Sequence, residues 1–166
     1  MNTKNKVDCL FLITKSSSKT YQKLSVTYSA IEPPTWALLL AQSMRAVGNE
    51  VRILDANAED LSQEDILKKI EFFSPRLICI VVYGQNVNAG TTSMSGAIFV
   101  SKYLKDKNIN IPISIIGSHV QALPIETLEK EKSIDFVFTN EGVYALRNIL
   151  KLKNFSVEEL EKIKGI

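Results

Sequence analysis

Three polar segments carry the side chains best suited to bind a ligand, and each follows an apolar run. The first, residues 83–94, combines amides, hydroxyls and two glycines directly after Leu77–Val82. The second is Gly117-Ser118-His119-Val120, and the third is Asn140-Glu141-Gly142. Amides and hydroxyls bind ligands through hydrogen bonds, and loops at strand ends are the usual place for such groups. The pattern favours ligand binding, although an ordinary solvated crossover loop also fits the first segment.

These residues do not assemble a known catalytic site. His119 is the only histidine, so any serine or cysteine nucleophile would depend on it, and a hydrogen-bonded turn residue is the simpler interpretation. Glu141 can cap the following helix or accept from a ligand hydroxyl. Cys9 and Cys79 fall inside apolar runs without metal-ligand spacing, as buried hydrophobes do. The sequence therefore predicts a binding module rather than a complete enzyme.

Common nucleotide and phosphoacceptor motifs are missing. The sequence holds neither Gly-x-Gly-x-x-Gly after its first apolar run nor Gly-x4-Gly-Lys-Ser/Thr. A receiver domain needs an acidic cluster after strand one and an aspartate ending strand three, where this chain has Ile13-Thr14 and Tyr83. The segment Thr14-Lys15-Ser16-Ser17-Ser18 weakly matches the phosphate loop of a flavodoxin. An FMN-binding protein therefore stays open as an alternative.

Apolar runs alternate with helical patterns along the chain. The expected strands are Val7–Ile13, Val51–Leu54, Leu77–Val82, Ile113–Ile116 and Asp135–Phe138. The expected helices are Thr35–Val47, Gln63–Phe73, Thr92–Lys107, Pro124–Glu131 and Val143–Leu152, and Ser62 is the expected N-cap of the second. Strands this apolar are covered on both faces, as in a parallel α/β sheet. The prediction is a flavodoxin-like, doubly wound five-stranded sheet of order 2-1-3-4-5 in three αβα layers.

In that topology the switch point lies between strands one and three, so ligand should meet the loops after Ile13 and Val82. The first loop runs about twenty residues, far longer than the usual connection. A net charge of +2 with mixed signs gives no reason to expect nucleic acid or membrane binding. The N-terminus has no signal-peptide pattern, which predicts a cytoplasmic protein.

The pattern changes after Leu152. We expect residues 1–152 to form one domain and residues 153–166 to form a linker helix, with Ser156 and Glu159 as its capping box. A docked tail is the alternative.

Taken together, the loop residues resemble the N-terminal cobalamin-binding domain of B12-dependent radical SAM proteins. This group includes anaerobic Mg-protoporphyrin monomethyl ester cyclases and B12-dependent methyltransferases. The resemblance covers about residues 7–152 and depends on the order and spacing of Pro33-Pro34-x5-Leu40, Ala46-x-Gly48-x2-Val51, Leu54-Asp55-Ala56-Asn57, Tyr83-Gly84-Gln85-Asn86, Gly117-Ser118-His119-x2-Ala122-Leu123-Pro124 and Asp135-Phe136-Val137-x3-Glu141-Gly142.

The resemblance implies a corrinoid across the carboxyl edge of the sheet, with its nucleotide tail inserted between strands and a helix. Small residues suit such a site because backbone must approach the tail closely. The cobalamin-binding residues expected on this basis are Thr14, Ser16, Tyr83, Gly84, Gln85, Asn86, Thr91, Thr92, Ser93, Met94, Gly117, Ser118, His119, Val120, Asn140, Glu141 and Gly142.

Two departures from related proteins shape the expectation. Cobalamin domains of mutases carry Asp-x-His-x-x-Gly after strand one, whereas Thr14–Pro33 holds no histidine. A base-off cobalamin without a histidine ligand is implied, with His119 reaching the metal as the alternative.

The second departure is the lack of a Cys-x3-Cys-x2-Cys cluster. A [4Fe-4S] cluster and S-adenosylmethionine would therefore belong to a radical SAM domain outside this chain. The chain is then an excised domain or a free-standing module, and the chemistry of the parent, methyl transfer or radical rearrangement, resides elsewhere. A ligand-free scaffold for a protein partner is a further alternative.

Overall fold

Five short apolar runs pair side by side as parallel strands. The computed structural model describes residues 6–15, 31–84 and 87–166. The strands are β1 (Cys9–Ile13), β2 (Val51–Asp55), β3 (Leu77–Val81), β4 (Ile113–Ile116) and β5 (Phe136–Val137). Their order is β2-β1-β3-β4-β5, and each neighbouring pair is parallel. The predicted sheet order is confirmed.

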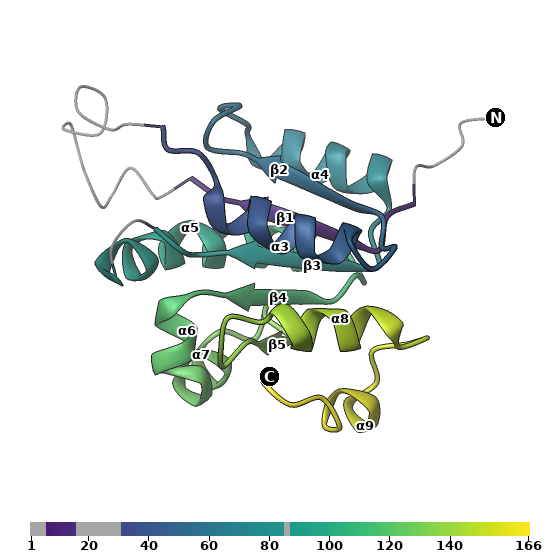
Figure 1. Ribbon diagram of the computed structural model, residues 1–166. Helices are drawn as coiled ribbons and strands as arrows, with labels where there is room; N and C mark the ends of the chain where they lie inside the picture. Colours follow the sequence, from purple (N-terminus) through teal and green to yellow (C-terminus); the bar gives the residue numbers. More distant parts are fainter. Residues whose placement is uncertain (1–5, 16–30, 85–86) are drawn as a thin grey trace.

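Helices cover both faces of this sheet (Figure 1). On one face, α3 (Thr35–Arg45) and α8 (Val143–Lys151) lie over the strands. On the other face lie α4 (Gln63–Phe73), α5 (Val87–Asp106) and α7 (Pro124–Lys130). Two short helices, α6 (Ser118–Ala122) and α9 (Val157–Leu160), complete the described part. No helix in the described ranges is long and apolar enough to cross a membrane.

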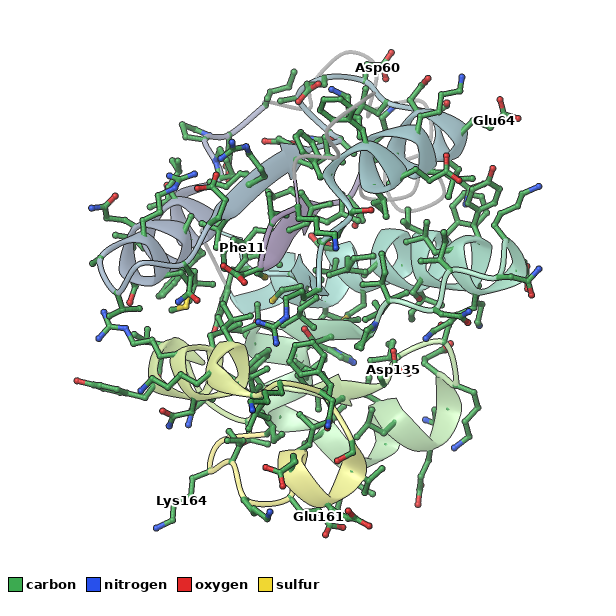
Figure 2. The ribbon with its side chains drawn as sticks, turned by 90° about the vertical axis from the view of Figure 1, so that its right-hand side faces the viewer. Phe11, Asp60, Glu64, Asp135, Glu161 and Lys164 are labelled. Carbon is green, nitrogen blue, oxygen red and sulfur yellow. The ribbon has the colours of Figure 1, made fainter. Side chains whose placement is uncertain are left out.

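Alternate residues of each strand point to opposite faces and form two apolar layers. Leu10, Leu12 and Ile80 pack under α4 and α5, whereas Phe11 and Cys79 pack under α3 and α8. Figure 2 shows Phe11 in the interior of the molecule. Each fully buried large side chain contributes about 1.5–3 kcal/mol relative to an exposed one. This two-sided burial explains why the strands read as continuous apolar runs.

The two cysteines behave as core residues. Cys9 and Cys79 are both free and fully buried, as the sequence indicated. Burial raises the pKa of the Cys79 thiol to about 12, and desolvation likewise raises the pKa of Cys9. Both thiols therefore stay protonated near neutral pH, and neither is a reactive nucleophile.

The start of α5 differs from the prediction. The helix begins at Val87, five residues before the expected Thr92, so residues 87–94 are helical rather than a loop. Their composition of asparagine, glycine and threonine indicated a loop. Tertiary packing overrides that preference. The backbone at Gly90 lies so close to Val82 that a Cβ there would be 2.9 Å from the Val82 carbonyl oxygen. Other predicted bounds, such as those of β1 and α3, differ by one or two residues.

The segment after α8 folds back onto the domain. Phe155, Leu160, Ile163 and Ile166 pack against the apolar layer under α3 and α8. The predicted capping box is wrong, because the Ser156 side chain makes no capping hydrogen bond. The role of residues 153–166 as a linker to another domain stays a prediction.

The predicted N-cap at Ser62 is confirmed and can be tested. Its hydroxyl accepts from the Asp65 amide at 3.2 Å, and the Asp65 carboxylate accepts from the Ser62 amide. Ser62→Ala should lower the free energy of unfolding by about 1 kcal/mol, as loss of an N-cap hydrogen bond does. Ser156→Ala is the matched control and should change it by less than about 0.5 kcal/mol. Urea unfolding of both variants measures this, and equal effects would contradict the assignment.

Candidate functional site

Parallel pairing brings four strand-end segments to one edge of the sheet. They are Thr14 after β1, Tyr83-Gly84 after β3, Gly117 to His119 after β4, and Asn140 to Gly142 after β5. The N-terminal end of α5 and the short helix α6 lie at the same edge (Figure 1). The structure thus places most of the predicted binding residues together. Three of them, Ser16, Gln85 and Asn86, lie outside the described residues.

Tyr83 stands at the switch point of the sheet and contacts side chains from two other elements. Its ring stacks on Trp36 of α3, with centroids 4.5 Å apart. The Gln121 side-chain amide of α6 donates a hydrogen bond to the phenol oxygen. Burial, followed by the negative charge of Glu141, raises the pKa of the Tyr83 phenol, and the Gln121 hydrogen bond opposes that rise. An aromatic pair with a fixed phenol therefore lines the edge beside β1 and β3.

His119 is tied to α5. The hydroxyl of Thr91 lies 3.2 Å from its Nδ1, so this hydrogen bond joins the first turns of α5 to α6. Thr92 and Ser93 lie half-buried in the same turns of α5. The side chains of Met94 and Val120 belong to the apolar core, where they position backbone rather than offer polar groups. Thr91 and His119 thus link α5 to α6 in this part of the edge.

Backbone approaches backbone closely where α5, β3 and β4 meet. A Cβ at Gly117 would lie 2.6 Å from the Val82 carbonyl oxygen, and a Cβ at Gly90 would lie 2.2 Å from the Ser118 hydroxyl. Real Cβ atoms do not tolerate such distances, so only glycine fits either position. Gly90 thus lets α5 rest directly on the residues that follow β3 and β4, and Gly117 lets the end of β4 approach the end of β3.

The loop after β5 is shaped by its own hydrogen bond. Asn140 Oδ1 accepts from the Gly142 amide at 2.8 Å, and Gly142 has φ of +71° at the start of α8. A Cβ at Gly142 would also lie 2.4 Å from Ile116 Cδ1. Asn140 thus makes the turn, and the exposed Glu141 carboxylate acts on Tyr83 through its charge.

Sequence reasoning missed Trp36 and Gln121. Trp36 lies in the first turn of α3, soon after Pro33-Pro34, where it is 39% exposed and stacks on Tyr83. It is the only tryptophan in the sequence and follows the long loop after the first strand, and these two features could have marked it as a candidate site residue. Gln121 could not be found, because the segment after β4 read as a loop and α6 was not expected.

The raised pKa of Tyr83 gives a direct test of this arrangement. Since the folded protein favours the neutral phenol, Tyr83 contributes stability below a pH of about 10 and loses it as pH rises through the folded pKa. When the wild type is titrated with base, its tyrosinate absorbance should include a late step, at a pH above that of an ordinary tyrosine, and Tyr83→Phe should remove this step. Tyr144→Phe, at a 76% exposed position, should leave that step in place. A late step that persists without Tyr83 would contradict the assignment.

Known proteins share this fold. The TsrM radical S-adenosylmethionine methyltransferase of Kitasatospora setae, with cobalamin and a [4Fe-4S] cluster bound, superimposes with a TM-score of 0.62 at 14% identity, covering 87% of this chain and 24% of that one. Its structure with tryptophan and a SAM analogue gives 0.60 at 15% identity, covering 86% and 24%. At these identities the likeness establishes the fold alone.

Sequence comparison identifies the family. The uncharacterized methyltransferase PH0819 of Pyrococcus horikoshii is 30% identical over 134 residues, which cover 81% of this chain and 27% of that protein. The chain thus spans about a quarter of the length of the relatives it matches. The model of the B12 binding domain matches residues 22–150. The chain therefore belongs to the B12-binding domain family, whose ligand is cobalamin.

Proposed function

We propose that this chain binds cobalamin at the carboxyl edge of its sheet, across the ends of β1, β3, β4 and β5. The observation that carries the proposal is the family match over residues 22–150, on a sheet whose switch point lies between β1 and β3. Open α/β sheets bind ligands at such switch points. Residues from all four strand ends would contribute.

The groups at this edge suit a corrinoid. The ring carries amide side chains, which pair with exposed neutral donors and acceptors such as Thr91 and Asn140. The first turns of α5 offer backbone amides to the phosphate of the nucleotide tail. Among the described residues, no group of three or more His, Cys, Asp or Glu could hold a metal ion. The bound cofactor supplies cobalt-centred methyl-transfer or radical chemistry.

The histidine content supports a proposal for the form of the bound cofactor. The loop after β1 contains no histidine in its sequence, and the chain's sole histidine, His119, lies after β4 with its Nδ1 beside Thr91. We therefore infer that cobalamin binds base-off without a histidine on its lower face. The Thr91 hydrogen bond would also orient His119 for coordination through Nε2, so a direct test is needed.

The catalytic partner is proposed to be a radical SAM domain, either on the same polypeptide or on a separate one. The relatives are more than about three times the length of this chain, and the TsrM structure holds a [4Fe-4S] cluster together with cobalamin. This chain would then present the upper face of the corrinoid, and the partner would bind the cluster, S-adenosylmethionine and the substrate.

Cofactor binding is the first test. After incubation with hydroxocobalamin and desalting, the protein should retain the corrinoid with a base-off visible spectrum. Ligand at a hundredfold excess over its dissociation constant should also add about 2.7 kcal/mol to the free energy of unfolding, seen as a rise in Tm. FMN is the parallel sample and should give neither effect. Colourless protein at saturating cobalamin would contradict the proposal, and retention of FMN would favour the flavodoxin-like alternative.

His119 provides the second test. His119→Ala should leave the visible spectrum of the bound cofactor unchanged, because the imidazole is proposed to hydrogen-bond Thr91 rather than to ligate cobalt. Thr91→Val is the matched control, since it removes the same hydrogen bond and keeps the imidazole. A shift of the absorption bands in His119→Ala alone would place the imidazole on cobalt and overturn the base-off, histidine-free assignment.

A further inference from the structure

The tail, residues 152–166, is anchored at its start beside the amino ends of the strands. The Arg76 guanidinium, just before β3, donates to the Leu150 carbonyl at 3.1 Å and to the Leu152 carbonyl. The same guanidinium lies over the Phe155 ring, 5.4 Å from its centroid. These contacts direct the chain back across the domain after α8 ends.

The middle of the tail is held by apolar packing. Leu160, Ile163 and Ile166 contact the buried layer that contains Phe138 and Ile149. The neighbouring Glu161 and Lys164 point outward to solvent (Figure 2). The alternation of inward apolar and outward charged side chains gives the tail one face that belongs to the domain.

The end of the tail reaches the candidate cofactor edge. The Thr139 amide donates to the Gly165 carbonyl at 2.9 Å. Gly165 has φ of +96°, and a Cβ there would lie 2.5 Å from Asn140 Nδ2. Asn140 in turn makes the turn at Gly142 through its side-chain oxygen. Gly165 therefore contacts the loop from which the candidate residues Asn140, Glu141 and Gly142 come.

We infer that the tail positions the loop between β5 and α8 for cobalamin, so that tail docking and cofactor binding strengthen each other. This inference rests on the proposed function. The loop follows a strand of only two residues, so its backbone gains support from Gly165 rather than from a long ladder. If docking favours the binding conformation, then binding must favour docking by the same factor. Gly165 and Ile163 are thus positioning residues, not ligand contacts.

The first experiment measures the effect of the tail on affinity in the full chain. Gly165→Val should displace the tail end, because it combines an unfavourable φ with a clash at Asn140. We expect its Kd for hydroxocobalamin, followed by quenching of Trp36 fluorescence, to rise about fivefold or more. Lys164→Ala, at an exposed position beside it, is the matched control and should leave Kd unchanged. Ile163→Ser is a second variant that loosens the tail through its apolar contact.

The second experiment tests the reverse direction on the wild type. Saturating hydroxocobalamin should slow trypsin cleavage after Lys162 and Lys164. The fold decrease in the cleavage rate should equal the fold increase in Kd that undocking of the tail causes. Hydrogen exchange of the Thr139 amide reports docking itself and should quicken in Gly165→Val. This measurement needs no cofactor, so it separates a change in the tail from a change in binding.

The outcomes are distinct. Faster Thr139 exchange in Gly165→Val with an unchanged Kd, or wild-type cleavage that cobalamin does not slow, would overturn the coupling and leave the proposed function intact. Failure of the wild type to bind cobalamin would overturn both. If Gly165→Val does not fold, then Ile163→Ser and the wild-type protection experiment decide the matter.

Discussion

The constraint on which this molecule depends is that all five strands run the same way and are buried on both faces. Parallel strands place every carboxyl end at one edge, and every connection must cross the sheet as a helix. Segments separated by up to about 130 residues, from Thr14 to Gly142, therefore meet at that edge. The apolar layers under α3 with α8 and under α4 with α5 hold the strands between the two helical layers.

At that edge, backbone contacts set the shape more than side chains do. Gly90 brings α5 onto the ends of β3 and β4, and Gly117 brings the end of β4 close to Val82. Gly96 likewise brings α5 close to Lys15, where a Cβ would lie 1.8 Å from the carbonyl oxygen. Side chains then provide cross-links between elements, as with Thr91 to His119 and Gln121 to Tyr83. A large, amide-rich ligand needs this combination of close backbone and neutral polar groups, whereas it needs little from charged side chains.

The sequence predicted the sheet well because strands buried on both faces must be apolar throughout, and Leu77–Val81 could hardly be read otherwise. The Ser62 cap was also visible, since its partner lies three residues away. What escaped prediction depends on contacts between distant segments. The early start of α5 at Val87 goes with the packing of Gly90 on Val82, and the Trp36–Tyr83 stack joins two elements. The capping box at Ser156 failed for the opposite reason, because the local pattern was present and its hydrogen bond was not.

The shortest strand explains why the tail matters. β5 has two residues and lies at the edge of the sheet, so its pairing to β4 alone fixes little backbone. Its start is held by Asp135, whose carboxylate accepts from the Ile113 amide at 2.7 Å and pairs with Lys105. Its end is held by the Gly165 carbonyl on the Thr139 amide. Both hydrogen bonds involve residues outside the strand, but only the bond to Gly165 lies beside Asn140 and Gly142. A change in the tail therefore acts on the proposed cofactor loop, at the carboxyl ends of the strands. A change at Asp135 acts instead at the amino ends of the strands.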